Sequence, residues 1–125
     1  MALTKEQIRR EINNLTRVKN NYDSEVVKYR NSLSYANKLV KNLTNTINYL
    51  NSANDYMKRY FTINKKTADD GEINKNKEQI NKIIKKLNST IIPSINSNIN
   101  DLNIKITKTN REINILKRQY ETVEI

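Results

Sequence analysis

Two neighbouring carboxylates, Asp69 and Asp70, are the residues of this chain that most resemble a catalytic pair. Paired acids take part in acid–base chemistry where a pocket perturbs their ionisation. These two stand in a polar stretch beside the only glycine, Gly71, and we expect them to be solvated in a turn. The sequence contains no His and no Cys, which removes the imidazole and thiol groups most often used for acid–base catalysis and zinc binding. We therefore expect no enzymatic activity, no cofactor and no metal site.

Basic side chains give the chain its second chemical character. Lys and Arg number 23 against 13 Asp and Glu, which leaves a net charge of +10. Such an excess favours an acidic partner: nucleic acid, an anionic membrane surface or an acidic protein. The charges are spread along the chain with acids among them, whereas nucleic-acid-binding proteins usually show a cleaner basic stripe. We prefer a solvated helix surface and keep nucleic-acid or anionic-surface binding as the alternative.

The apolar residues of the first half are spaced for a coiled-coil helix. Steps of four and three residues alternate without interruption, as they do where one helix packs along another. Thr4 and Gln7 match a capping box at the start. We therefore predict a helix over 4–62. Its seam, the row expected to face the second helix, is Ile8, Ile12, Leu15, Lys19, Tyr22, Val26, Tyr29, Leu33, Ala36, Val40, Leu43, Ile47, Leu50, Asn54, Met57 and Phe61.

A turn and a second helix should follow. Residues 63–72 contain Gly71 and two Asp, which predicts a turn, and the heptad pattern resumes over 73–124. The pattern slips by one residue at Pro93, where we expect a kink or a short break because proline lacks a backbone donor and clashes with the preceding turn. The second seam is Ile73, Lys77, Ile80, Ile84, Leu87, Ile91, Ile95, Ile99, Leu102, Ile106, Thr109, Ile113, Leu116, Tyr120 and Val123.

The two seams fit each other when the chain is folded back about residue 67. This fold pairs Leu15 with Tyr120 near the termini and Leu43 with Ile91 near the proline. Antiparallel helices joined by a short turn are the economical arrangement of two such segments. The predicted fold class is all-α, with a single domain over 1–125 built as a long antiparallel two-helix coiled-coil hairpin.

A hairpin of this kind is marginally stable by itself. Each helix buries one stripe, which must offset an ordering cost of roughly 1.5 kcal/mol per residue. Two positions of the first seam, Lys19 and Asn54, are polar. We expect Lys19 to extend past Leu116 into water and leave open whether Asn54 fixes the register. Self-association or a helical partner should provide the remaining stability.

A second row of residues on the first helix runs beside the seam and could bind that partner. Tyrosine combines a large apolar ring with a polar hydroxyl and is favoured at protein interfaces. The alternative is that these rings lie flat on the hairpin and cover its seam. The row predicted to bind a partner is Tyr35, Leu39, Tyr49, Ala53, Tyr56 and Tyr60.

The layout resembles a family of small helical hairpins in bacterial secretion. The shared features are the length, the near-symmetric hairpin, the absence of Cys, and the segment Tyr120-Glu121-Thr122-Val123-Glu124, which matches the family's Tyr-x-x-x-Asp/Glu export signal. The family comprises the WXG-like partner proteins of LXG toxins in Gram-positive type VII secretion. This chain differs from the classical members in having no Trp-x-Gly turn. The resemblance implies a targeting chaperone that binds the helical N-terminal region of a toxin and helps present it to the secretion ATPase. Tyr120 and Glu124 would contribute to recognition by that machinery.

The expected function is therefore that of an adaptor for a larger helical protein. A second small helical partner or a homo-oligomer remains an option. Residues 1–20 contain no apolar signal segment, and no run of apolar residues approaches a membrane span. We expect a chain without a signal peptide or transmembrane segment that begins in the cytoplasm, with export, if it occurs, by the type VII route. The alternatives are a basic coiled coil that binds nucleic acid or an anionic surface, and a self-assembling structural coiled coil.

Overall fold

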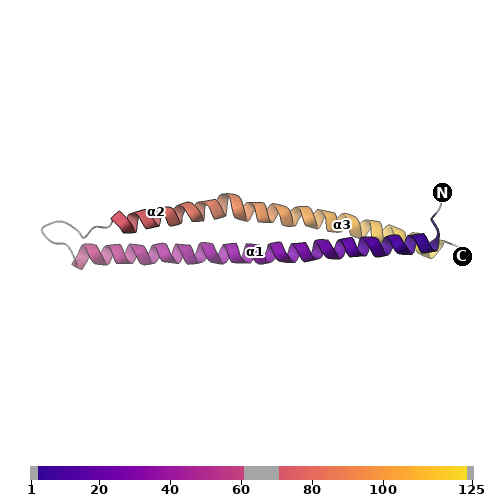
Figure 1. Cartoon of the computed structure of the whole chain (residues 1–125), viewed down its shortest axis with the longest axis horizontal. Coiled ribbons are helices and arrows are strands. Elements are labelled where there is room, and N and C mark those ends of the chain that lie inside the picture. Colours follow the sequence, from indigo (N-terminus) through magenta and orange to yellow (C-terminus); the bar gives the residue numbers. More distant parts are fainter. Residues whose placement is uncertain (1–2, 61–70, 124–125) are drawn as a thin grey trace. The chain divides into compact units, whose positions relative to one another are not determined.

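The computed structural model describes residues 3–60 and 71–123, nearly all of them helical (Figure 1). Helix α1 covers Lys5–Tyr60. The second half of the chain forms α2 at Gly71–Lys86, the π-helical turn η1 at Leu87–Ile91, and α3 at Ile92–Thr122. No strand occurs in the described ranges. The all-α hairpin fold class predicted from the heptad pattern is confirmed.

The capping box closes the first end of α1. The backbone N–H of Gln7 donates to Thr4 Oγ1 at 3.1 Å, and the backbone N–H of Thr4 donates to Gln7 Oε1 at 2.9 Å. Glu6 in the first turn lies 2.7 Å from Arg9 Nη2, and its negative charge suits the positive end of the helix. The reciprocal bonds satisfy backbone donors that have no partner within the helix, which explains why α1 begins at Lys5.

The second helix begins earlier than the sequence pattern predicts. Gly71 and Glu72, which fall within the predicted turn, are the first two residues of α2, so the turn prediction is wrong for them. Glycine is accepted at helix starts, and the charge of Glu72 favours the first turn of a helix. The rest of the predicted turn, with Asp69 and Asp70, lies outside the described residues, as does Phe61 of the first seam.

The predicted phase slip at Pro93 is accommodated by the π turn immediately before it. The backbone N–H of Ile92 donates to the carbonyl of Leu87, five residues earlier. A π turn of this kind inserts one extra residue into a helix, which is the one-residue slip in the seam. Helical residues continue without interruption from α2 through η1 into α3, so the helix is not broken at Pro93.

The extra residue corrects one seam position. Ile91 was expected to face Leu43, but it is 37% exposed, while its neighbour Ile92 is half-buried. The π turn rotates the following residues around the helix axis, and Ile92 therefore takes part of the place that a regular α-helix would give to Ile91.

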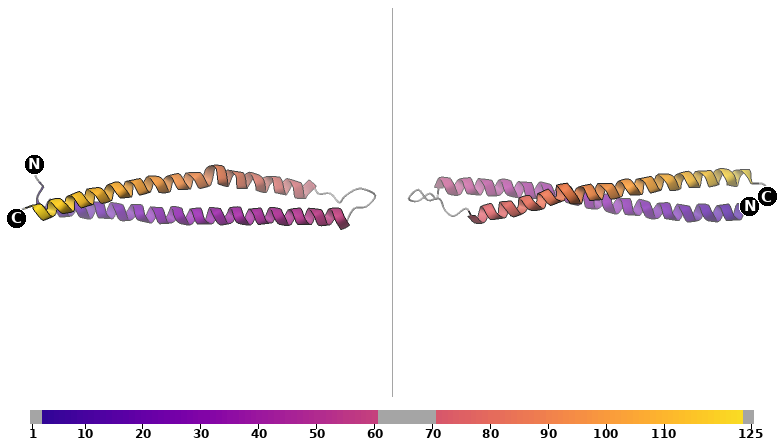
Figure 2. Two further views of the ribbon diagram at one scale, coloured as in Figure 1. Left: turned by 180° about the vertical axis from the view of Figure 1, so that it is seen from behind. Right: turned by 90° about the horizontal axis from the view of Figure 1, so that it is seen from above.

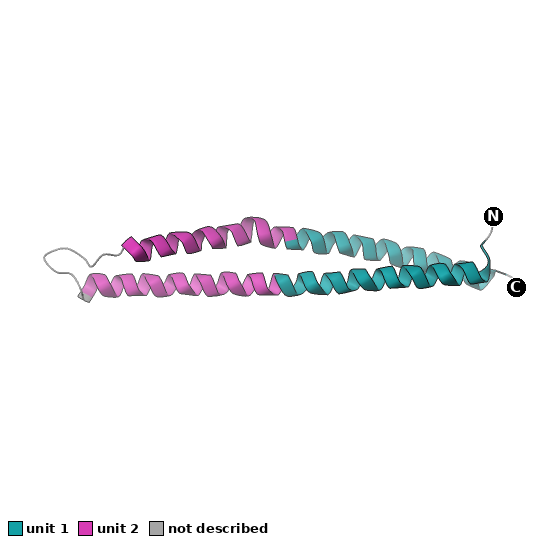
Figure 3. Ribbon diagram, in the orientation of Figure 1, with its two compact units in different colours: residues 1–32, 95–125 teal, residues 33–94 magenta. Residues whose placement is uncertain are grey.

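The chain divides into two compact units, coloured separately in Figure 3. Unit 1 combines Met1–Ser32 with Ile95–Ile125, and unit 2 is Leu33–Ser94. Within each unit, a stretch of α1 lies alongside a stretch of the second helix and runs in the opposite direction (Figures 1 and 2). Unit 1 buries Ile8, Val26, Ile99, Leu102, Thr109 and Ile113, and unit 2 buries Ala36, Asn54 and Leu87.

Burial follows the predicted seams closely. Every described position of the first seam is buried or half-buried. The other residues of α1 whose burial is described are exposed, except for Lys5, Val18 and Asp23. Every position of the second seam other than Ile91 is likewise buried or half-buried. The spacing of apolar residues therefore decides which stripe of each helix is removed from water.

Candidate docking surface

The tyrosine row predicted to bind a partner lies on α1 within unit 2. Its aromatic side chains are open to solvent: Tyr35 is 79% exposed, Tyr49 is 78% exposed and Tyr56 is 55% exposed. Leu39 is 40% exposed, and Ala53 is also exposed. Rings exposed to this extent do not cover the seam, and those of Tyr35 and Tyr49 present most of their apolar area to solvent.

The tyrosines of the chain separate into two groups by heptad position. Tyr22, Tyr29 and Tyr120 occupy the seams and are half-buried. In the predicted row, Tyr35, Tyr49 and Tyr56 take heptad position c, one step further around the helix from the seam than position g. Position g is taken by Leu39, Ala53 and Tyr60. Tyr60 is the last residue of α1, and its side chain falls outside the described part of the structure.

One side chain of α2 extends this row into a broader surface. Ile83 has the g position of its own heptad and is 49% exposed. Because g positions flank the seam on one side, Ile83 belongs to the same side of unit 2 as Ala53. We call this surface the tyrosine face and define it as Tyr35, Leu39, Tyr49, Ala53, Tyr56 and Ile83.

The centre of the tyrosine face carries no charge on α1. No charged residue occurs from Asn42 to Asn54, although 29% of all residues in the chain are charged. A shallow depression in this stretch is lined by Asn45, Asn48, Tyr49 and Ser52. Amides and hydroxyls both donate and accept hydrogen bonds. On α1 the centre of the surface thus offers aromatic contact and neutral hydrogen bonds but no cation, whereas on α2 the exposed Lys86 lies three residues beyond Ile83 on the same side.

Comparison with known proteins identifies no relative: no protein-family model, curated protein or solved structure matches this chain.

The tyrosine face holds a large share of the exposed apolar side chains. Among the described residues, the large hydrophobic side chains that are exposed are Leu3, Val27, Tyr35, Leu39, Tyr49, Tyr56, Ile83, Ile91, Ile104 and Ile115. Half of these belong to the tyrosine face, and apolar side chains gathered on one surface mark interaction sites more often than scattered ones do.

The segment that matches an export signal is only partly described. Tyr120 is half-buried at its seam position, and the ammonium of Lys5 lies 4.8 Å from the centroid of its ring. Glu124 lies outside the described residues. Tyr120 therefore has a packing role within unit 1, whatever else it contacts.

The two polar positions of the first seam behave differently. Lys19 is half-buried, and its Nζ lies 3.3 Å from Asp23 Oδ2, one turn further along α1. Its charge is thus neutralised by a neighbour at the edge of the seam. Asn54 is only 8% exposed, and its Oδ1 has no hydrogen-bond partner. A buried amide oxygen without a partner lowers stability by about 1–3 kcal/mol.

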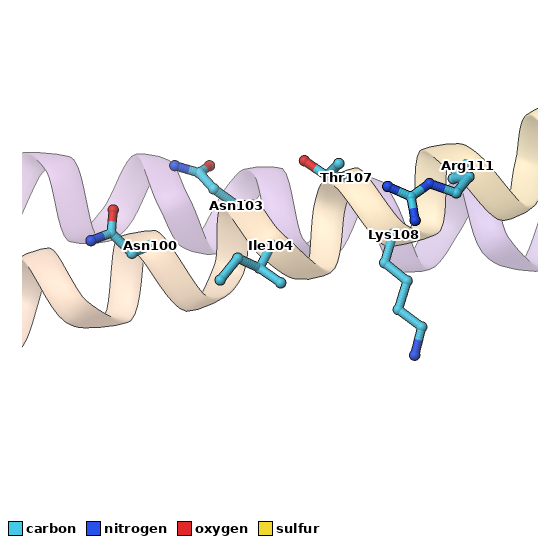
Figure 4. Close-up of a pocket in the computed structure, with 6 residues that line it drawn as sticks. All are labelled: Asn100, Asn103, Ile104, Thr107, Lys108 and Arg111. Atoms are coloured by element: carbon cyan, nitrogen blue, oxygen red, sulfur yellow. The ribbon is translucent and has the colours of Figure 1, made fainter.

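The described residues contain no constellation for metal chemistry. They include no group of three or more acidic side chains that could hold a metal ion. A depression along α3 is lined by residues of that helix alone, so it is open surface rather than a cavity between elements (Figure 4). No described helix combines the length and the apolar character needed to cross a membrane.

Proposed function

We propose that this chain is a non-enzymatic adaptor that binds a helical segment of a larger protein through the tyrosine face. The observation that carries the proposal is the exposure of Tyr35 and Tyr49, at 79% and 78%, with Tyr49 inside the uncharged stretch from Asn42 to Asn54. Buried aromatic side chains contribute much of the binding energy at protein interfaces. Tyr49, Ala53 and Tyr56 are spaced four and three residues apart, which suits contact with another helix.

The resemblance to the partners of LXG toxins narrows this proposal. The larger protein would be a type VII effector, bound through its helical N-terminal region, and the adaptor would help to present it for export. Support comes from the hairpin layout and from the Tyr-x-x-x-Glu spacing of Tyr120 and Glu124. We propose that these two residues contribute to recognition by the secretion machinery.

The basic excess supports a different function, binding to nucleic acid or to an anionic surface. The observation that supports this alternative function is the net charge of +10. The uncharged stretch of α1 from Asn42 to Asn54 disfavours this function at the α1 part of the tyrosine face. Ionic strength separates the two, because binding to phosphates weakens steeply as salt is added, whereas an aromatic and amide interface weakens little.

Affinity capture from the native cells tests the adaptor function. The chain is used as bait in a nuclease-treated extract, the complex is washed at high salt, and bound proteins are identified by mass spectrometry. We expect one large protein with a helical N-terminal region, in near-equal amount to the bait. Recovery of nucleic acid alone when nuclease and salt are omitted, or of the bait alone as an oligomer, would contradict the proposal.

A further inference from the structure

We propose a second docking surface, on α3 in unit 1, that binds an acidic amphipathic helix of a partner protein. It lies in the other unit from the tyrosine face and does not depend on the function proposed for that face. Steps of four and three residues connect its members, so they form one line along the outer side of α3, away from the seam. This isoleucine–cation stripe is Ile104, Lys108, Arg111, Ile115 and Arg118.

The isoleucines of the stripe are open to solvent. Ile104 is 67% exposed and Ile115 is 46% exposed. A single exposed isoleucine is common on protein surfaces, but these two lie on one line, about three helical turns apart. Figure 4 shows Ile104 and Lys108 on the same side of α3. Apolar and basic side chains therefore share one ridge of the helix.

The cations of the stripe have no acidic partner. None of the ion pairs between described residues, such as those of Glu6, Asp23 and Glu78, includes Lys108, Arg111 or Arg118. Lys105 differs, because its ammonium lies 5.8 Å from the centroid of the Tyr22 ring on the seam side. The donors of the stripe are thus available to carboxylates from another molecule.

Asp101 continues the line of the stripe three residues before Ile104, whereas no acid interrupts the line from Ile104 to Arg118. Between Ile104 and Arg118 the only acid is Glu112, at the g position beside the seam. A partner that matches the stripe therefore carries carboxylates opposite its cations. The shallow depression around Ile104 provides room for an apolar side chain of that partner, and it is lined by Asn100, Asn103, Ile104, Thr107, Lys108 and Arg111 (Figure 4).

The spacing of the stripe favours a helix over other acidic ligands. Two isoleucines interleaved with cations at four and three residues match the side-chain rows of a packed helix. Phosphate groups of nucleic acid would use the cations but gain nothing from the isoleucines. A membrane-surface helix needs a broad apolar face with its cations to the side, whereas here they occupy the same line.

A synthetic peptide provides the probe. It is a labelled monomeric helix with Leu at the a and d positions and Glu at the flanking positions, and its matched control has Lys in place of Glu. Binding to the purified full chain is measured by fluorescence anisotropy. We expect the Glu peptide alone to bind, with Arg111→Glu weakening it about tenfold because attraction becomes repulsion and Ile104→Asn weakening it about fivefold.

Two control variants outside both docking surfaces keep the test specific. Lys75→Glu on α2 makes the same charge change, and Val27→Asn on α1 places the same amide at another exposed apolar position; both should leave the affinity within about twofold. Circular dichroism establishes that each variant is helical. The proposal is overturned if neither peptide binds, if both bind equally, or if the control variants weaken binding as much as the stripe variants. Binding of the wild type to phosphatidylglycerol vesicles without peptide binding would also overturn it and assign the stripe to lipid.

Discussion

The ammonium of Lys5 lies 4.8 Å from the centroid of the Tyr120 ring, which joins the first turn of α1 to the last turn of α3 within unit 1. Tyr120 is also a half-buried member of the second seam. A cation near an aromatic ring contributes about 0.5–1 kcal/mol at exposed sites. Tyr120 therefore helps to close the terminal end of unit 1, and its proposed part in export recognition has to be separated from this packing role.

Substitutions at Tyr120 separate the two roles. Tyr120→Phe keeps the ring, and the free energy of unfolding should change by less than about 0.5 kcal/mol. Tyr120→Ala removes the ring from the seam and from Lys5, and should lower that free energy by about 2 kcal/mol. Urea unfolding followed by circular dichroism measures both. An Ala variant as stable as the wild type would show that the ring does not pack as described.

The buried amide of Asn54 should limit stability. Asn54→Leu replaces an unpaired oxygen with an apolar group, and we expect the free energy of unfolding to rise by about 1–2 kcal/mol. Asn51→Leu, at an exposed position of the same helix, should change it by less than about 0.5 kcal/mol. Sedimentation velocity shows whether the Asn54 variant keeps one species, as it would unless the amide fixes the register. A loss of stability in Asn54→Leu would contradict the absence of a partner.

Deleting one residue should convert the π turn η1 into regular α-helix once Pro93 is replaced. Deleting Ser89 in a Pro93→Ala background takes out the extra residue together with the cause of the clash, and brings Ile92 into the regular seam spacing. The free energy of unfolding should stay within about 1 kcal/mol of the Pro93→Ala protein. Deleting the exposed Asn103 in the same background dislocates every later seam residue and should cost roughly 3 kcal/mol or more. Equal effects of the two deletions in thermal unfolding would refute this account of η1.

Two threonines, one in the capping box and one inside α1, should respond in opposite directions to replacement by alanine. Thr4 Oγ1 accepts the backbone N–H of Gln7, so Thr4→Ala should lower stability by about 1 kcal/mol. Thr16 Oγ1 donates to the carbonyl of Ile12 in the helix interior, where alanine is the better helix former. Thr16→Ala should therefore raise stability slightly. Melting temperatures that move in the same direction for both variants would contradict the cap.

The heptad pattern allowed the fold to be predicted because the spacing of apolar residues indicates which side of each helix is buried. It located the seams and the slip at Pro93, but it could not choose between the kink and the short break expected there, and it did not indicate the π turn that the structure contains. That choice depends on local backbone hydrogen bonds around Leu87 and Ile92. The contact of Lys5 with Tyr120 was likewise out of reach, because it requires the relative position of two helix ends.

The candidate surfaces were partly visible in the sequence. Spacing placed Tyr35 and Tyr49 beside the seam, but only the structure shows that their rings are exposed rather than laid over it. The isoleucine–cation stripe follows the same four and three spacing and was readable in principle. It escapes a pattern search for apolar residues because the members between Ile104 and Ile115 are charged.

The central claim is that the tyrosine face binds a helical partner. The most direct test measures binding and unfolding on the same variant. The variant carries Tyr35→Ser and Tyr49→Ser, and its control carries Val27→Ser, a 56% exposed residue of α1 in unit 1. The affinity for the purified helical region of the captured partner is measured by calorimetry beside urea unfolding. We predict that the double variant binds at least about tenfold more weakly while both proteins unfold at the wild-type midpoint. Unchanged affinity, or a loss of stability that accounts for the loss of binding, would contradict the claim.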